Sequence, residues 1–541
     1  MSYIDWTILV TTLAAIIVYG VYKSRTSKDL DGYFLSNRDM PWYLVLLSIM
    51  GTQASAITFL SAPGQAYTDG MRFVQYYFGL PLAMVVICIV FVPVFNKLKV
   101  YTAYEFLENR FDLKTRTLTS FLFQVSRGLS TGISIYAPSI ILSSLLGWNI
   151  YYTNIIMGGL LIIYTVTGGA KAVAHTQKLQ LAIVFTGMFI SGYIVVHLMP
   201  ETVGFVKALH IGGAHDKMNI ITSGRTANGF DWKDKYNIWS GIIGGFFLAL
   251  SYFGTDQSQV GRYLTAKNNR QSKMGLLMNG IVKVPMQFLI LLLGVLVFSF
   301  YQFHKPPIYF DQNQIVRAKQ TSYKDSLVSL EAKYATITPD DVAGKTRVKS
   351  DYKKMLSKAL PAEDINDTNF IFLRFVIDYL PQGLLGLLIA VIFLAAWGSI
   401  AAALNALASC TVVDIHKKFI KKDLTREMDY RISKLYTLAW GIFCILVAEF
   451  ASNLGNSLIE TVNILGSLFY GVILGIFLVA FWFKKIQANA TFYASALAEV
   501  FVIIIYKANI ISFLWLNVIG ALLVIIFGYA LQLFLNKKQN T

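Results

Sequence analysis

Long apolar stretches alternate with short polar segments along this chain, and charged residues gather in the polar segments. Many apolar stretches reach about 20 residues, the length that a helix needs to cross a hydrocarbon layer of about 30 Å. About thirteen such spans are expected, near residues 4–22, 41–64, 74–96, 117–145, 150–168, 177–199, 236–263, 274–303, 382–414, 432–452, 459–483, 488–506 and 511–535. The pattern predicts an all-α polytopic membrane protein.

The second span contains a run of small and polar residues, GTQASAIT at 51–58, although no charge occurs between Asp39 and Asp69. A helix in lipid must satisfy its own backbone, so an irregular stretch persists only where protein or a wet cavity surrounds it. Interrupted helices also expose backbone carbonyls to a cation in transporters. The run predicts a broken helix beside a polar cavity, although small residues also form plain packing seams.

A second cluster lies in the span at 382–414. Ala395, Gly398 and Ser399 are spaced at i, i+3 and i+4, so they share one face of a helix. Carbonyl and hydroxyl oxygens on this face suit sodium, whereas a carboxylate would be costly in the membrane.

The composition agrees with this class, because 55% of the 541 residues are hydrophobic and only 14% are charged. The formal net charge is +17, but Lys and Arg collect at alternate ends of the spans, as the positive-inside rule requires. The charge therefore indicates topology rather than nucleic-acid binding. We expect a multi-pass protein of the plasma or inner membrane, with its N-terminus outside and its C-terminus in the cytoplasm.

The motifs of an enzyme are missing from the sequence. Cys88, Cys410 and Cys444 lie in apolar surroundings and lack the spacing of a disulfide or a metal site. No HExxH motif and no phosphate-binding glycine-rich loop occurs. We therefore expect no enzyme activity and no metal other than sodium.

One hydrophilic insertion, about residues 304–368, interrupts the apolar pattern. Its segments KDSLVSLEAKY and DYKKMLSKAL have the periodicity of amphipathic helices. Two interpretations stay open: a solvated loop that caps the extracellular mouth, and a docking surface for an outer partner.

Several blocks follow one another in the order of a known family. They are DGYFLSNRDMPWYLVLLS, PVFNKLKVYTAYEFLENRF, IYAPSIIL, YTVTGGAKAV and GTDQSQVGRYLTAK. On these blocks the chain resembles the sodium/solute symporter family over about residues 30–485. That family includes bacterial galactose and sialic-acid transporters and animal glucose, iodide, monocarboxylate and multivitamin carriers. The stretches SAPGQAY and FQVSRGLSTGISIYAPS are more similar to the iodide, monocarboxylate and vitamin branch than to the sugar branch.

The resemblance implies a LeuT-type core of two inverted five-helix repeats within residues 41–485, working by alternating access around a midplane site. An extra helix and its connection would occupy residues 1–40, and two further helices residues 486–541. The family's usual sodium site, carried over position by position, falls on Gly51, Ala54, Ala395, Gly398 and Ser399.

The chain departs from the family pattern at this cation site. Many members have two adjacent hydroxyls where this chain has Gly398 and Ser399, and an aspartate where it has Gln177. We therefore expect one sodium ion rather than two. Lys178, next to Gln177, has two open interpretations: its ammonium replaces the cation, or it snorkels to the cytoplasmic surface.

The sugar contacts of the galactose carrier are largely absent, since its usual polar positions are Tyr77, Ala249 and Val462 here. Arg127, the one charge between Arg116 and Lys171, suits a carboxylate, although it can also bond helix-end carbonyls. The expected substrate-binding residues are Gln53, Ser55, Thr58, Gln75, Tyr76, Tyr77, Arg127, Ser251, Tyr252, Thr255 and Asn463.

The sequence as a whole predicts a secondary transporter in the lipid bilayer that couples sodium entry to uptake of a small polar solute. An organic anion is the preferred solute, and a sugar or polyol is the alternative. Sodium-independent or proton-linked transport with Lys178 near the cation site is a second alternative. A solute-sensing transceptor is the alternative from another class of protein. The oligomeric state stays open.

Overall fold

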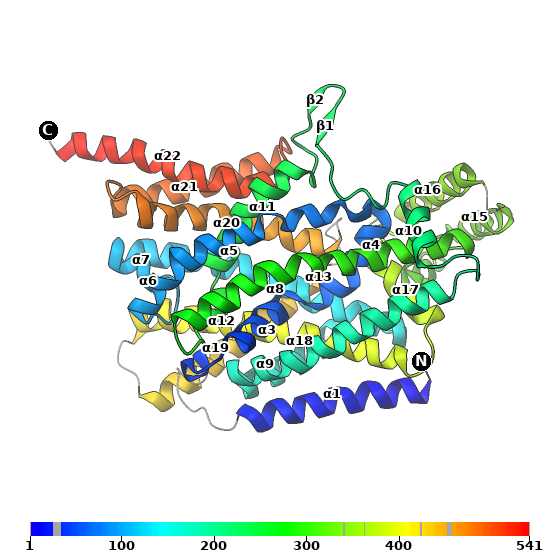
Figure 1. Ribbon diagram of the computed structural model, residues 1–541, viewed down its shortest axis with the longest axis horizontal. Helices are drawn as coiled ribbons and strands as arrows, with labels where there is room; N and C mark the ends of the chain where they lie inside the picture. Colours follow the sequence, from blue (N-terminus) through cyan, green and yellow to red (C-terminus); the bar gives the residue numbers. More distant parts are fainter. Residues whose placement is uncertain are drawn as a thin grey trace.

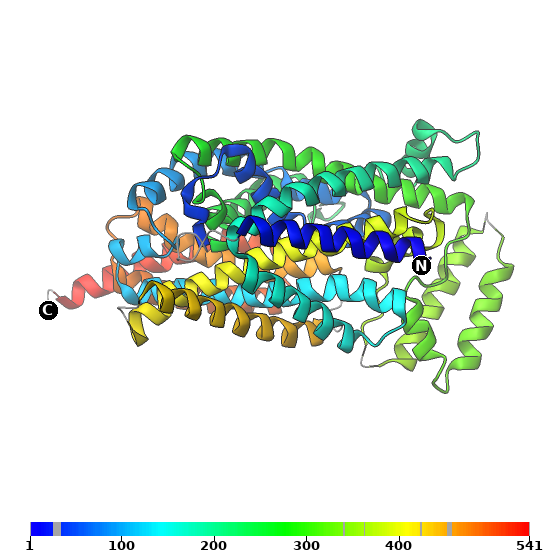
Figure 2. The ribbon, with the colours of Figure 1, turned by 90° about the horizontal axis from the view of Figure 1, so that it is seen from below.

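Helices that lie side by side in one elongated bundle make up nearly all of the computed structural model (Figure 1). The structure describes residues 2–24, 34–338, 341–361, 363–421, 425–451 and 457–539. The N-terminus lies at one end of the bundle and the C-terminus at the opposite end (Figures 1 and 2). The orientation with the N-terminus outside and the C-terminus in the cytoplasm stays a prediction.

The elements before the insertion begin and end as follows: α1 Tyr3–Ser24, η1 Ser36–Arg38, α3 Trp42–Gln53, α4 Ala56–Asp69, η2 Gly70–Tyr77, α5 Leu80–Ile89, α6 Phe91–Leu98, α7 Glu105–Arg110, α8 Leu113–Leu146, α9 Ile150–His197, α10 Phe205–Ala214, the hairpin β1 Arg225–Thr226 and β2 Gly229–Phe230, the π-helix η3 Ser240–Gly244, α11 Gly245–Gly254, α12 Gln257–Tyr263 and α13 Asn269–Phe303.

The remaining elements are α14 Gln312–Ala318, α15 Lys324–Thr336, α16 Val342–Ala359, η4 Thr368–Phe370, α17 Ile371–Tyr379, α18 Leu384–Cys410, the π-helix η5 Thr411–Ile420, α19 Arg426–Glu449, α20 Leu458–Trp482, α21 Ala488–Lys507 and α22 Phe513–Gln539.

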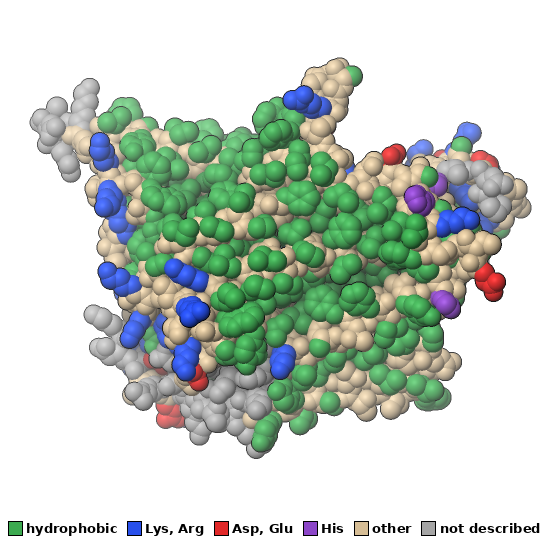
Figure 3. Space-filling model, in the orientation of Figure 1, with side chains coloured by type: hydrophobic (Ala, Val, Ile, Leu, Met, Phe, Trp, Pro, Cys, Tyr) green, Lys and Arg blue, Asp and Glu red, His purple; other side chains and the backbone are tan. Residues whose placement is uncertain are grey.

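The apolar pattern translates into membrane-spanning helices. Within the described residues, nine helical stretches are long and apolar enough to cross a membrane, and four shorter apolar helices accompany them. Apolar side chains cover the middle of the bundle, whereas Lys and Arg gather at the end that carries α7 and α21 (Figure 3). The expected all-α polytopic class is confirmed, and the count of about thirteen spans stays a prediction.

The expected break in the second span is present between α3 and α4. Ala54 has φ −77° and ψ 66°, and Ser55 is extended with φ −83° and ψ 169°. The freed carbonyl of Gln53 accepts a hydrogen bond from the Thr58 hydroxyl at 3.1 Å. A local run of small and polar residues is therefore enough to interrupt this helix, and the interruption faces the interior of the bundle.

Helix α9 covers two of the expected spans, near 150–168 and 177–199, and it is not one straight rod. The hydroxyls of Tyr164 and Thr176 lie 2.9 Å apart, although 12 residues separate them along the chain. Twelve residues of a straight helix would extend about 18 Å. The axis of α9 is therefore not straight from Tyr164 to Thr176.

The insertion forms its own small folded unit at the end of the bundle that carries the N-terminus (Figure 2). Helices α15 and α16 include the two segments whose periodicity predicts helices. Together with α14 they bury a separate apolar cluster that contains Leu327, Tyr334, Tyr352 and Leu356. The segment is thus a small folded unit, and its role as a cap of the extracellular mouth or as a docking surface stays a prediction.

The N-terminal end of α18 is hydrogen bonded to α1, a helix outside the expected transporter core. The carboxylate of Asp5 accepts hydrogen bonds from the backbone N–H groups of Gly383, at 2.6 Å, and Gly386, at 3.2 Å. These are unpaired donors at the start of α18, and an acidic group near a helix N-terminus is stabilising. The extra N-terminal helix therefore helps to hold the helix that carries Ala395, Gly398 and Ser399.

Candidate functional site

The break between α3 and α4 opens onto a cavity of about 140 Å³ in the middle of the bundle. Its walls also include residues of η2, α8, α11, α13, α18 and α20. These segments are far apart in sequence, and the fold brings their polar side chains together around one space. Eight of the eleven expected substrate-binding residues line it: Gln53, Ser55, Thr58, Tyr76, Tyr77, Arg127, Tyr252 and Asn463.

The other three residues, Gln75, Ser251 and Thr255, do not line the cavity. Gln75 donates from its amide to the carbonyl of Tyr236 at 3.1 Å. The Ser251 hydroxyl donates to the carbonyl of Tyr470 at 2.7 Å, and the Thr255 hydroxyl donates to the carbonyl of Ser251 at 2.8 Å. All three side chains are fully buried; Gln75 and Ser251 hold neighbouring segments together, and Thr255 bonds within the end of its own helix. The structure thus gives them packing contacts in place of the expected solute contacts.

Arg127 lies in the cavity wall and is only partly satisfied there. Its Nη1 lies 3.8 Å from Oδ2 of Asp256, and its guanidinium carbon lies 5.8 Å from the centre of the Tyr252 ring. Its Nε has no hydrogen-bond partner among the described residues. Asp256 also accepts a hydrogen bond from the Tyr470 hydroxyl at 2.8 Å. Arg127 therefore has a structural partner in Asp256, and its buried Nε is left without an acceptor.

Lys283 of α13 is a cavity residue that the sequence reasoning missed. Its side chain is 1% exposed, and its Nζ lies 5.5 Å from the centre of the Tyr77 ring. No carboxylate of the described residues lies within ion-pair distance of this ammonium group. A sequence signal existed, because Lys283 is the one Asp, Glu, Lys or Arg between Lys273 and Lys305.

The expected sodium ligands lie around a glutamine of α9. Gln177 donates from Nε2 to the carbonyl of Gly398 at 3.3 Å, and its Oε1 accepts from the Ser48 hydroxyl at 3.1 Å. Its Cγ lies 2.8 Å from where a Cβ on Gly51 would stand, so only glycine fits there. The fold therefore brings Gly51 and Gly398 together, with the Gln177 amide between them.

The remaining cation-site residues, Ala54, Ala395 and Ser399, are also buried. Ala54 and Ala395 are 2% and 3% exposed, and Ser399 lines the central cavity. The Ser399 hydroxyl donates to the carbonyl of Ala396 at 3.0 Å, which leaves its oxygen lone pairs available as ligands. Lys178, in contrast, is exposed, whereas the neighbouring Gln177 is buried.

No group of three or more His, Cys, Asp or Glu side chains suited to a metal ion occurs in the described part of the chain. The oxygens available in this region belong to backbone carbonyls, hydroxyls and amides. Such neutral oxygen ligands fit sodium, a hard monovalent cation, better than a transition metal, which prefers imidazole or thiolate ligands.

Comparison with known proteins identifies the relatives of this chain. The sequence model of the sodium:solute symporter family matches residues 33–329 and 351–497. The sodium/sialic acid symporter SiaT of Proteus mirabilis is 27% identical over 99% of this chain and 97% of its own. The human sodium/iodide cotransporter is 26% identical over 84% of this chain and 62% of its own.

The fold is similar to that of a solved transporter. A substrate-bound, outward-open structure of a Na⁺-coupled sialic acid symporter matches with a TM-score of 0.79 and 24% identity, covering 98% of both chains. The expected LeuT-type fold is thereby confirmed, and the protein is a membrane transporter rather than an enzyme. With residues 33–329 and 351–497 matched, the chain belongs to the sodium:solute symporter family.

Proposed function

We propose that this protein is a sodium-coupled symporter that carries a small organic anion across the membrane by alternating access. The observation that carries the proposal is the charge of the central cavity. Arg127 and Lys283 both line it, and among the described residues Asp256 is the one carboxylate within ion-pair distance of either. With Lys283 protonated, the side chains that line the cavity carry one positive charge more than Asp256 balances, and an anionic solute would neutralise it.

Lys283 contributes most to this argument. Burying an ammonium group without a counter-ion is costly, and ionisable groups inside membrane proteins usually mark a substrate or ion path. A carboxylate bound in the cavity would supply the counter-charge that Lys283 lacks there. Some curated relatives are named for sialic acid or monocarboxylates, and both are carboxylates.

The size of the cavity favours a small solute. Sites for drug-sized ligands usually measure about 300–1,000 Å³, and this cavity measures about 140 Å³. Side chains of Tyr76, Tyr77 and Asn463 offer polar groups to the rest of the solute, and Tyr76 already donates to Asn463 at 3.1 Å. A sugar or polyol could use these same groups, so it remains the alternative.

One sodium ion per cycle is the proposed stoichiometry, held by Gly51, Ala54, Ala395, Gly398 and Ser399. Nε2 of Gln177 lies 3.3 Å from the Gly398 carbonyl and 3.4 Å from the Thr52 hydroxyl. These two oxygens already receive an amide hydrogen, and Gln177 brings no negative charge. A second ion beside Gln177 would therefore lack a ligand charge, which supports one ion. The exposed position of Lys178 speaks against its replacing the cation.

Ser399→Ala is expected to raise the sodium concentration for half-maximal uptake about fivefold, because the ion loses one oxygen ligand worth about 1 kcal/mol. The measurement is initial uptake into proteoliposomes as a function of external sodium. Ser409→Ala is the matched control, since Ser409 is buried in the same helix and its hydroxyl donates to the carbonyl of Ala406. Equal sodium dependence in the two variants would remove Ser399 from the site.

The proposal as a whole is tested by a thermal-shift screen of the purified protein, followed by uptake measurements with and without a sodium gradient. A ligand of the folded state raises apparent stability by RT ln(1 + [L]/Kd). We expect small carboxylates to raise the melting temperature more in sodium than in potassium, and to accumulate inside proteoliposomes. A shift with sugars or polyols alone would overturn the substrate class. Binding without accumulation under any ion gradient would favour the transceptor.

A further inference from the structure

A second hollow lies at the surface of the bundle, far from the central cavity. It is an apolar groove between the start of α8, the π-helix η5 and the start of α21. Its lining includes Leu118 and Phe121 of α8, Ile415 and Phe419 of η5, and Phe492 of α21. Phe121 and Phe419 are more than half exposed. Nothing in the transport cycle described above uses this groove.

The depth of the groove in the membrane follows from the helix rise. Ser130 of α8 lines the central cavity, which transporters of this architecture place near the midplane. At 1.5 Å per residue, Phe121 lies about 14 Å and Lys114 about 24 Å from the level of Ser130 along α8. The hydrocarbon core extends about 15 Å from the midplane, followed by the headgroup layer. The phenyl ring of Phe121 therefore reaches lipid tails, and Lys114 reaches lipid phosphates.

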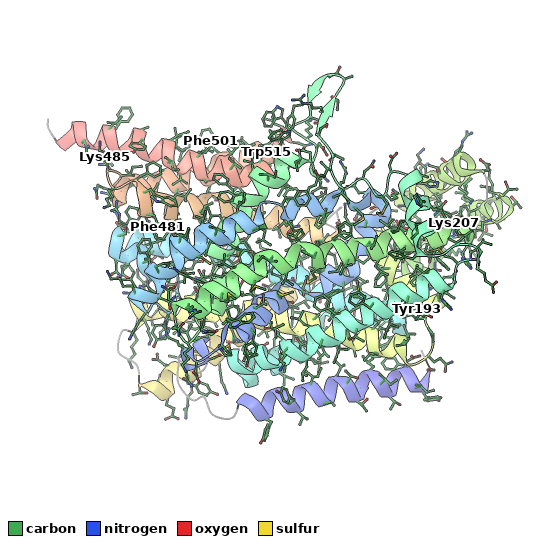
Figure 4. The ribbon with its side chains drawn as sticks, viewed as in Figure 1. Tyr193, Lys207, Phe481, Lys485, Phe501 and Trp515 are labelled. Atoms are coloured by element: carbon green, nitrogen blue, oxygen red, sulfur yellow. The ribbon has the colours of Figure 1, made fainter. Side chains whose placement is uncertain are left out.

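Basic side chains surround the headgroup end of the groove. Lys114 lines it, and its Nζ donates to Oδ1 of Asn489 at 2.8 Å. Arg110 donates to the carbonyl of Lys484 at 3.2 Å, which brings the connection before α21 against α7. This end of the bundle is the one where Lys and Arg gather in Figure 3, and Figure 4 labels Lys485 there.

The charge at this rim is not balanced by acids. The segments that border the groove carry eight basic residues, Arg110, Lys114, Arg116, Lys417, Lys418, Lys421, Lys484 and Lys485. They carry four acids, Glu105, Glu108, Asp112 and Asp414. Glu108 pairs with Lys418 at 2.9 Å, and Asp112 lies 3.6 Å from Lys114. An apolar channel that ends in excess positive charge at phosphate depth is complementary to an anionic phospholipid.

We propose that this groove binds an anionic phospholipid, with one acyl chain along Leu118, Phe121 and Phe419 and the phosphate against Lys114. The positive-inside rule places this end of the bundle in the inner leaflet. The bound lipid would join α8 and α21 to η5, which continues directly from the helix with the candidate sodium ligands. Lipid binding is therefore expected to support transport as well as stability.

The test uses the full-length protein in detergent, titrated with phosphatidylglycerol or phosphatidylcholine and followed by native mass spectrometry and melting temperature. Three variants are compared. The triple variant Lys114→Gln/Lys421→Gln/Lys485→Gln lowers the rim charge, and Leu118→Trp fills the groove. The control variant Lys267→Gln/Arg270→Gln removes two exposed basic residues near the start of α13. Inorganic phosphate is titrated separately.

The wild type is expected to bind phosphatidylglycerol more tightly than phosphatidylcholine, and inorganic phosphate is expected to leave the melting temperature unchanged. Each basic residue near the headgroups contributes about 1 kcal/mol to the binding of an anionic lipid, which is about fivefold in affinity. The triple rim variant is therefore expected to bind phosphatidylglycerol at least about fivefold more weakly than the wild type. Leu118→Trp is expected to weaken both lipids, and the control variant to bind as the wild type does. Equal binding of both lipids by the wild type overturns the proposal. So does unchanged binding of phosphatidylglycerol by the rim variant, or an equal loss in the control.

Discussion

Replacing Lys283 by methionine is expected to remove uptake of the anionic solute almost completely while the protein still folds. Methionine has nearly the shape of the lysine stem but carries no charge. The ammonium group of Lys283 lies in the cavity without a carboxylate partner among the described residues, so its removal leaves no other charge unpaired. The loss therefore falls on the bound solute rather than on the fold.

Arg127 is a less clear test of the same idea. Its removal would leave Asp256 buried without the nearby cation, and that carboxylate would keep only neutral donors, the Tyr470 hydroxyl and the N–H and hydroxyl of Ser258. A loss of uptake in Arg127→Gln could then arise from a rearranged cavity wall. Lys283 has no such second consequence, and for this reason it is the sharper variant.

Truncating one partner of a buried charge pair costs about 2–5 kcal/mol. We therefore expect the solute Kd of Lys283→Met to rise about 30-fold or more, measured by the ligand-induced melting shift and by initial uptake. Lys283→Arg keeps the charge and is expected to retain part of the activity. Lys273→Met makes the same substitution nearer the start of α13, outside the cavity, and is expected to transport normally. Wild-type affinity in Lys283→Met would show that the solute is not held through its charge.

The class of fold could be predicted from the sequence because each membrane helix must be apolar over its own length. The break at Ala54 and Ser55 could also be predicted, because the cause is local: a run of small and polar residues weakens the helix there. The fold of the insertion could be predicted only in part. Its helices have a visible period, but the cluster that joins Leu327 to Tyr352 depends on contacts between segments.

The candidate site shows the same limit. A polar residue near a broken helix can face the cavity or a neighbouring helix, and sequence spacing alone does not decide which. Gln75 and Ser251 hydrogen bond to the backbone of neighbouring segments, although their residue types and their positions along the chain match those of residues that line the cavity. Arg127 and Asp256 lie 129 residues apart, so their proximity follows only from the packing of α8 beside the junction of α11 and α12.

Gln177 illustrates a second kind of limit. Its position predicts a weakened second cation site, because an amide replaces the family's carboxylate. The sequence does not indicate that the amide itself hydrogen bonds to the Gly398 carbonyl. Lys178 is the converse case, since its position in the chain suggests the cation site and its side chain is exposed. Successive side chains of a helix point about 100° apart around its axis. Gln177 can therefore face the buried cation site while Lys178, the next residue, faces the surface.

Charges buried for structural reasons form a separate cluster, at the junction of α18 and η5. Asp414 is fully buried, and Arg116 of α8 donates to its Oδ1 at 2.9 Å through Nε and at 2.5 Å through Nη2. The hydroxyls of Thr102 and Ser120 donate to the same carboxylate at 2.8 and 2.9 Å. This cluster joins three segments at the end of the helix that carries the candidate sodium ligands.

Arg116→Met is expected to destabilise the folded protein by about 3–5 kcal/mol, because it leaves the buried carboxylate of Asp414 without its cation. The measurement is the midpoint of thermal or denaturant unfolding in detergent. Arg431→Met is the matched control: Arg431 pairs with Glu427 at 2.6 Å, but both side chains are about three-quarters exposed. Exposed pairs contribute about 0–1 kcal/mol, so this variant should unfold nearly as the wild type does.

A second substitution separates the lost cation from the lost packing. Adding Asp414→Asn to Arg116→Met replaces the stranded carboxylate by a neutral amide, which the hydroxyls of Thr102 and Ser120 can still reach. Because an isolated buried charge costs far more than a hydrogen-bonded neutral group, the double variant is expected to recover much of the lost stability. If the double variant is no more stable than Arg116→Met, the arginine stabilises this junction through its packing, and the charge of Asp414 is not what makes its loss severe.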